Sequence, residues 1–199
     1  MTLYAASTTT DGLHVINARV TYRNAQIHLL EKFAFSDLNN AYGIFMDQSG
    51  LKECIILQTC NRVEIFGAST SPNQEKLLDG WASAVGLDKN ELHDVVEVNN
   101  DREVVLHLLK LASGLDSLVI GEDQILGQVK RAFEYSRTKQ YVGSHLSVIF
   151  ERAIKIGSRV RADTALNKGS VSIGSMAVNL ASEYFDDLKT KKILLIGSG

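Results

Sequence analysis

The spacing of the apolar residues changes near residue 100, and this change constrains the fold of the 199-residue chain more than any other feature. Before it, short apolar runs typical of strands alternate with segments that carry one apolar face. After it, apolar residues recur every three or four positions, as on helices. The order strand, helix, strand, strand, helix, strand predicts an α+β fold that begins with a ferredoxin-like βαββαβ subdomain. The expected strands are 13–22, 52–58, 63–66 and 95–98, and the expected helices are 37–47 and 73–85.

The part of the chain after residue 100 is predicted to be helical. Apolar stripes indicate helices over 100–113 and 122–140, and a third helix is expected to begin at Ser144. Helices with one apolar stripe need a partner surface, so they are expected to pack together. We therefore expect a first subdomain over 1–99 and a helical subdomain over 100–166.

The last part of the chain, 167–199, has a different pattern. A helix rich in small residues is expected over 170–185, and an apolar strand over 191–196 runs into Gly197 and Gly199. A strand that ends in such a glycine turn is typical of the start of a Rossmann-type dinucleotide-binding unit, although many other strands end in a similar turn. We expect the chain to stop as this truncated domain begins.

Composition excludes several classes of protein. The hydrophobic fraction of 45% is ordinary for a globular protein and too high for a disordered one. The longest apolar runs fall far short of the ~18–20 residues that cross a bilayer, and the N-terminus lacks the regions of a secretory signal. Two cysteines cannot build a disulfide framework and fit a reducing compartment. We expect a cytoplasmic globular protein with no membrane segment.

The net charge of −2 hides a basic segment, 130–168, in which nine lysines and arginines stand against three acidic residues. A local excess of six positive charges can attract a polyanion such as RNA. The alternative is a pair of helices whose charged side chains contact only water. The sequence leaves both interpretations open.

The two cysteines differ in their expected surroundings. Cys60 follows an apolar strand and precedes Arg62, a cation that would favour the nucleophilic thiolate. Its alternative role is structural, as a half-buried thiol, which is the more common case for a lone cysteine. Cys54 lies inside the strand, and only a structural role is expected for it.

Other candidate residues lie in the helical part. His107 stands in an apolar helix and is either a packed core residue or a proton-transfer group. The segment 114–130 places Ser117, Glu122 and Gln124 where they can face a pocket, unless Glu122 only caps the next helix. The chain has no CxxC or HExxH motif, and its other histidines have no partner at metal-ligand spacing. No metal site is expected.

Three stretches resemble the glutamyl-tRNA reductase family and follow in that family's order. QTCNRVEIF, at 58–66, is similar to its cysteine motif. His107 followed by SGLDSLVIGEDQILGQVKRAF, at 113–133, is similar to its second signature. GSVSIGSMAV, at 169–178, and the later ILLIGSG resemble the start of its NADPH-binding domain.

The resemblance implies an enzyme that reduces the glutamyl ester on tRNA(Glu) to glutamate-1-semialdehyde, the first step of the five-carbon route to tetrapyrroles. It implies that Cys60 holds the glutamyl group as a thioester, that NADPH supplies the hydride and that His107 assists proton transfer. Arg62 would bind the γ-carboxylate of the substrate. Gly197 and Gly199 would begin the NADPH site. The other substrate-binding side chains would be Thr59, Asn61, Ser117, Glu122 and Gln124.

The resemblance also implies partners. Glutamyl-tRNA would place its phosphates against the basic segment, and glutamate-1-semialdehyde aminomutase is a further candidate partner. Full-length members would form homodimers through a C-terminal helical domain that is expected to be missing here. We expect this chain to form the thioester and to deacylate glutamyl-tRNA, but not to reduce it. The loop 22–31 departs from the family pattern, since Gln26 replaces a proline and Leu30 an arginine.

Three other functions remain as alternatives. A ferredoxin-like sheet can bind RNA through aromatic strand residues, but 62–67 offers only Phe66 and lacks the RNP1 pattern. A generic NAD(P) dehydrogenase would explain ILLIGSG but neither 59–64 nor 114–130. A thiol hydrolase would use Cys60 with water, which would also attack a thioester formed without a hydride source.

Overall fold

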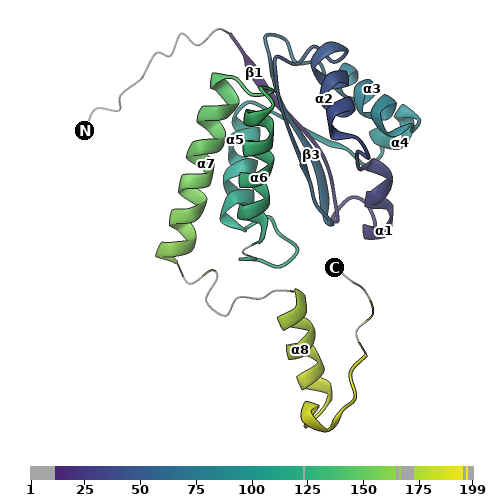
Figure 1. Ribbon diagram of the computed structural model, residues 1–199, viewed down its shortest axis with the longest axis vertical. Helices are drawn as coiled ribbons and strands as arrows, with labels where there is room; N and C mark the ends of the chain where they lie inside the picture. The colour runs from purple at the N-terminus through teal and green to yellow at the C-terminus, as the bar shows by residue number, and fades with distance from the viewer. Residues whose placement is uncertain (1–11, 123, 165, 167–172, 195, 197–199) are drawn as a thin grey trace.

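A four-stranded antiparallel sheet forms the centre of the molecule (Figure 1). The computed structural model describes residues 12–122, 124–164, 166, 173–194 and 196. The strands lie in the order β2-β3-β1-β4, and β3 pairs along its whole length with β1. The expected mixture of strands and helices is therefore confirmed. The strands are β1 (His14–Thr21), β2 (Glu53–Gln58), β3 (Arg62–Ser69) and β4 (Glu97–Asn100).

The fourth strand lies two residues later than the sequence pattern predicts. A short helix, α4 (Lys89–His93), precedes it and begins with a capping box in which Asp88 and Glu91 bond each other's backbone. The carbonyl of Leu92 then accepts hydrogen bonds from the backbone N–H groups of Val95 and Val96. These two valines therefore close a turn, and the strand pairs only from Glu97 onward.

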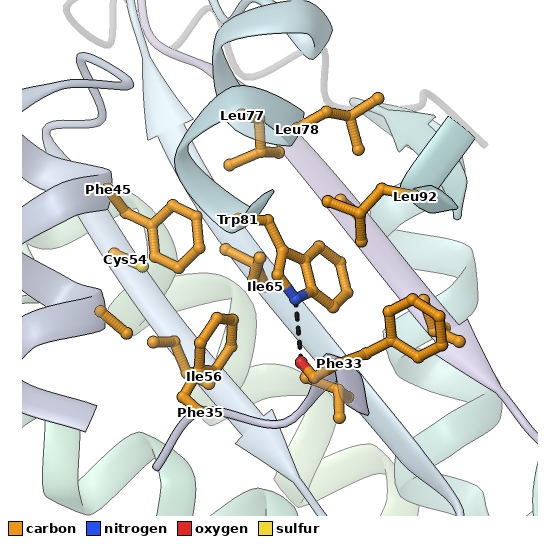
Figure 2. Close-up of a cluster of buried hydrophobic side chains, with 14 of the residues drawn as sticks. Phe33, Phe35, Phe45, Cys54, Ile56, Ile65, Leu77, Leu78, Trp81 and Leu92 are labelled. Atoms are coloured by element: carbon orange, nitrogen blue, oxygen red, sulfur yellow. Dashed lines mark hydrogen bonds between the residues drawn. The ribbon is translucent and has the colours of Figure 1, made fainter. Parts of the chain in front are cut away.

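One face of the sheet packs against α2 (Leu38–Asp47) and α3 (Gln74–Val85), with α1 (Ile27–Leu30) and the 3-10 helix η1 (Glu31–Phe33) at its edge. Figure 2 shows the apolar cluster between them. Trp81 is fully buried, and its indole N–H donates to the carbonyl of Phe33 at 2.9 Å. Cys54 and Ile56 point into this cluster from alternate positions of β2.

The other face packs against α5 (Arg102–Ser113), α6 (Gln124–Thr138) and α7 (Ser144–Asp163) (Figure 1). Ile55 and Phe66 from the sheet share one cluster with Leu108 and Phe150 from the helices. Gly157 lets α7 approach α5 closely, because a Cβ there would lie 2.6 Å from the backbone of Ala112. The three helices and the sheet thus share a continuous core, which fixes the helices relative to β3.

Glu53 joins β2 to the beginning of α7. Its carboxylate accepts backbone N–H groups of His145 at 3.1 Å and Leu146 at 2.8 Å. The first turn of a helix carries unpaired N–H groups and a positive dipole end, so a buried carboxylate stabilises it. A residue from a distant strand therefore caps the helix that begins at Ser144.

The expected strand over 191–196 is wrong for the residues that the structure describes. α8 (Ile173–Tyr184) forms within the expected helix, and the 3-10 helix η2 (Leu188–Thr190) follows it. Residues 191–194 and 196 form no strand, and Leu194 is 83% exposed. A strand needs a neighbour to accept its hydrogen bonds, and no described strand pairs with this segment. No described helix is long and apolar enough to span a bilayer.

Candidate active site

A short turn between β2 and β3 presents Cys60 to solvent. The hydroxyl of Thr59 accepts the backbone N–H groups of Asn61 at 3.1 Å and Arg62 at 3.2 Å, which tightens the turn. Cys60 is exposed, whereas Cys54 is fully buried. Burial raises the pKa of the Cys54 thiol, so this cysteine stays protonated and unreactive. The structure thus separates the two cysteines as the sequence predicts.

Cys60 borders a hollow of about 370 Å³ that lies between the turn, the loop after α5 and the first turns of α6. We call this space the Cys60 hollow. Ser117 is 6% exposed, and its hydroxyl has no hydrogen-bond partner among the described residues. A buried hydroxyl without a partner costs free energy, which a bound ligand can restore by supplying that partner. The lining residues are Thr59, Cys60, Asn61, Arg62, Ser117, Leu118, Glu122, Gln124, Ile125 and Gln128.

Seven of the eight described side chains that the sequence singles out therefore meet at one place. The exception is His107, which is not among the described residues that line the hollow and lies behind Arg62. Gly197 and Gly199, expected to begin a nucleotide site, lie outside the described residues. Among the described residues no group of three or more histidine, cysteine or acidic side chains is placed to hold a metal ion.

Arg62 is held at the base of the hollow by two acidic residues. It is 2% exposed, and its Nη1 donates to Glu64 at 2.7 Å and to Asp116 at 3.1 Å. Its Nη2 donates to the backbone carbonyl of Asp116. Burial opposes the charge, but Glu64 and Asp116 outweigh it and raise the pKa of Arg62. The Nε group and the second Nη2 hydrogen have no acceptor among the described residues, which leaves two adjacent donors for a ligand.

Glu64 is fully buried and organises the layer behind Arg62. It lies two residues along β3 from Arg62, so both side chains point to the same face of the sheet, toward α5. Its Oε2 lies 2.7 Å from His107 Nε2 and accepts from Asn17 at 3.3 Å. Burial alone would raise the pKa of Glu64, but His107 and Arg62 outweigh it and lower this pKa to about 2. Glu64 is therefore a stable anion that fixes both of its partners.

Asp116 is a site residue that the sequence analysis does not identify. Its Oδ1 accepts from Arg23 at 2.6 Å, its Oδ2 accepts from Arg62, and the same oxygen lies 3.7 Å from His107 Nδ1. Asp116 thereby joins the turn after β1 to β3 and α5. The available signal was its position, since it stands in the 114–130 segment beside Ser117 and close in sequence to a buried histidine.

The sequence does not reveal the role of Arg161 either. There, Arg161 is only one of the nine positive charges of the basic segment 130–168. It is 6% exposed and lies on α7. Its guanidinium donates to the backbone carbonyls of Ala112 at 3.3 Å, Gly121 at 3.3 Å and Glu122 at 2.7 Å. These carbonyls lie at the two ends of the loop that carries Asp116 and Ser117. Arg161 therefore holds that loop against the helices.

Gly121 shows how closely this loop is packed. Its φ of +85° is a conformation that other residues rarely adopt, and a Cβ there would lie 2.1 Å from the carbonyl oxygen of Leu166. Gly114, at the start of the loop, also has a positive φ, of +81°. The two glycines and Arg161 together give the loop one conformation, as a preformed binding site requires.

Comparisons with known proteins agree with this arrangement. Residues 18–164 match the family model described as "Glutamyl-tRNAGlu reductase, N-terminal domain". The chain is 50% identical over 185 residues to the glutamyl-tRNA reductase of Cenarchaeum symbiosum. The matched region covers 93% of this chain and 44% of that one. For the enzyme of Methanosarcina barkeri the identity is 39% over 180 residues, with 90% of this chain and 38% of that one covered.

A solved structure is similar as well. The glutamyl-tRNA reductase from Methanopyrus kandleri superimposes with a TM-score of 0.68 at 32% sequence identity, and the match covers 85% of this chain and 39% of that one. The chain thus spans less than half the length of these relatives. From the family model, the sequence identities and the shared fold, we conclude that the chain belongs to the glutamyl-tRNA reductase family and carries its N-terminal domain.

Proposed function

We propose that the chain accepts the glutamyl group of glutamyl-tRNA(Glu) on Cys60 as a thioester, which is the first half of the reduction to glutamate-1-semialdehyde in tetrapyrrole synthesis. One observation carries the proposal. The exposed thiol of Cys60 borders a hollow that also offers two donors of Arg62 and the unpartnered hydroxyl of Ser117. This set matches a carboxylic acid ester whose far end is an anion.

The reaction is an acyl transfer. The Cys60 thiolate attacks the ester carbonyl carbon, so that a C–S bond forms and the bond to the ribose oxygen breaks. The ribose oxygen takes up a proton and leaves as the free hydroxyl of the tRNA. No electrons are transferred in this half, because one acyl ester is exchanged for another. A thioester accepts hydride more readily than an oxygen ester does, and NADPH, when bound, supplies that hydride.

Recognition of glutamate rests on Arg62. The two neighbouring donors on Nε and Nη2 fit the two oxygens of a γ-carboxylate, whereas Glu64 and Asp116 hold the Nη1 side of the guanidinium. Ser117 supplies a further hydrogen bond, and Thr59, Asn61, Glu122 and Gln124 contribute the remaining polar groups of the hollow. A glutaminyl ester would leave a buried cation facing a neutral amide and so bind less well.

His107 supports the site from behind. Its contacts with Glu64 and Asp116, the two acids that hold Arg62, favour a positioning role. We keep proton transfer to the leaving oxygen as a second role for it, carried over from the family resemblance.

The larger assignments are proposals as well. The strand order β2-β3-β1-β4 supports a ferredoxin-like subdomain over 1–99, with 100–166 completing the catalytic domain and 167–199 beginning the NADPH-binding domain. Homodimer formation, contact with an aminomutase and an NADPH site at Gly197 and Gly199 belong to the same proposal. For the 199-residue chain alone we propose thioester formation followed by slow hydrolysis, which together deacylate the tRNA.

Replacing each cysteine by serine tests the proposal. Cys60→Ser is expected to reduce the deacylation of glutamyl-tRNA to the rate seen without protein, because the nucleophile is lost. Cys54→Ser is the matched control, since it makes the same change six residues away in the apolar cluster of Figure 2. It is expected to lower the stability by about 1–3 kcal/mol through burial of a hydroxyl, and to leave the rate per folded molecule unchanged. Equal loss of rate in both variants would contradict the assignment.

A further inference from the structure

Cys60 borders a second hollow, which lies between the β2–β3 turn and the first helices of the chain. We call it the α1 hollow. It measures about 1410 Å³ with the adjoining open solvent included, compared with about 370 Å³ for the Cys60 hollow on the same measure. Thr59 and Cys60 line both spaces, and the remaining lining differs. On the far side of the α1 hollow stand Gln26, which precedes α1, His28 and Leu30 of α1, and Glu31 of η1. The reactive thiol therefore stands between two separate binding spaces.

We propose that the α1 hollow binds the terminal nucleoside of the aminoacyl-tRNA, the alcohol half of the ester that Cys60 attacks. The inference rests on the function proposed above. In an ester under attack, the acyl chain and the alcohol oxygen diverge from the carbonyl carbon. When Arg62 holds the acyl chain in the Cys60 hollow, the alcohol half has to leave that hollow past Cys60. The space that it meets there is the α1 hollow.

The chemistry of the lining fits a neutral nucleoside. None of the described residues that line the α1 hollow is a lysine or an arginine, as a phosphate-binding space would require. His28 is exposed, and an imidazole ring can stack on a base. Gln26 and Glu31 offer hydrogen-bonding groups for a base edge or ribose hydroxyls, and the half-buried Ala34 supplies an apolar surface.

The hollow is preformed, because the chain that borders it is fixed to the sheet. The side chain of Gln58, at the end of β2, accepts the backbone N–H of Phe35 at 2.8 Å and donates to its carbonyl at 3.4 Å. Two residues earlier, the carbonyl of Phe33 accepts the indole N–H of Trp81, as Figure 2 shows. A ligand therefore need not order this segment, which lowers the cost of binding.

A nucleoside in the α1 hollow would give a role to the loop 22–31, whose departures from the family pattern leave its role open. Leu30 stands where the family pattern has an arginine, and it is buried under the hollow. The substitution removes a cation from the lining, which fits the uncharged part of the tRNA end.

The test compares two small esters of glutamate, 3′-O-glutamyl-adenosine and glutamate α-ethyl ester, by the rate at which each acylates Cys60 in the 199-residue chain. Wild-type protein is expected to react faster with the adenosine ester. His28→Ala is expected to slow that reaction about tenfold, the size of one stacking contact, and to leave the ethyl ester unchanged. His93→Ala, which changes another exposed histidine on α4, serves as the matched control and is expected to change neither rate.

A second measurement needs no acyl transfer. Adenosine alone is expected to slow the alkylation of Cys60 by iodoacetamide in the wild type and not in His28→Ala. Equal rates for the two esters together with no protection by adenosine would overturn the inference while leaving the thioester proposal intact. Protection by adenosine without acylation by either ester or by glutamyl-tRNA would instead overturn the thioester proposal and retain the nucleoside hollow. An equal slowing of both esters in His28→Ala would show a general disturbance of Cys60 and count against the inference.

Discussion

The two faces of strand β3 differ in what they bury, although the strand is the same. Val63 and Ile65 point into the apolar cluster with Trp81, while Arg62 and Glu64 point to the opposite face and form ion pairs. Val63, Arg62, Ile65 and Glu64 are all nearly inaccessible to solvent. The apolar face gains stability from burial, whereas the charged face requires that every ion find a partner. One strand therefore anchors the Trp81 cluster on one side and holds the ion pairs of the site on the other.

The largest expected effect on stability comes from the apolar face. Trp81→Ala removes a fully buried ring and one hydrogen bond and is expected to lower the free energy of unfolding by about 3–5 kcal/mol. Urea titration measures this loss. The rate at which glutamate α-ethyl ester acylates Cys60, per folded molecule, is expected to stay as in the wild type, because Trp81 lies on the opposite face from the ion pairs and does not line the Cys60 hollow. A loss of rate that exceeds the loss of folded protein would show that the two faces of β3 are not independent.

A smaller effect, which depends on pH, is expected from the charged face. The folded-state pKa of Glu64 is lowered to about 2, so its stabilising contribution is complete above the unfolded value near 4.5 and disappears as the pH falls toward 2. Glu64→Gln is therefore expected to be less stable than the wild type by about 3 kcal/mol at pH 7, and the difference is expected to shrink below pH 4.5.

Unfolding curves from pH 7 to pH 3 measure this difference. Glu97→Gln is the control, since Glu97 forms an ion pair with Arg19 from a half-exposed position. Its loss is expected to cost less than about 1 kcal/mol. A difference between wild type and Glu64→Gln that stays constant over this pH range would show that Glu64 does not act as a buried anion.

The smallest effect is expected from the loop that completes the charged face. Arg161→Lys keeps the charge but cannot reach three carbonyls at once, so the loop with Asp116 and Ser117 is expected to lose its single position. We expect KM for glutamyl-tRNA to rise about tenfold with a smaller change in kcat, a cost of about 1.4 kcal/mol.

The rate of alkylation of Cys60 by iodoacetamide separates this role from a general structural one. It is expected to stay unchanged in Arg161→Lys, because the turn that carries Cys60 belongs to the sheet. A large fall in kcat with unchanged KM would contradict the positioning role of Arg161.

Much of this arrangement could be predicted from local patterns. Asn73 caps α3 and Gly86 ends it with a positive φ, as their residue types indicate. The exposed Cys60 and the buried Cys54 follow from their places after and within an apolar strand. The residues that line the Cys60 hollow could be identified from the sequence because two motifs, at 58–66 and 113–133, carry them. Such features depend on neighbours close in the sequence.

The ionic layer behind Arg62 could not be predicted in the same way. Glu64 and His107 are 43 residues apart, and Arg62 and Asp116 are 54 apart, so their contacts depend on how β3 packs against α5. Arg161 illustrates the same limit, because a buried arginine and a surface arginine look alike in a basic segment. The strand expected over 191–196 is absent from the described residues 191–194 and 196 for a related reason, since a strand requires a pairing partner that its own residues cannot supply.

The central claim is that Cys60 becomes acylated. Glutamyl-tRNA carrying isotope-labelled glutamate would be mixed with the chain, the reaction quenched with acid, and the peptides analysed by mass spectrometry. We expect one added glutamyl group on the peptide that contains Cys60, and we expect hydroxylamine to remove it, as it removes a thioester. Label on the peptide of Cys54, or no label on any cysteine while the tRNA is deacylated, would contradict it.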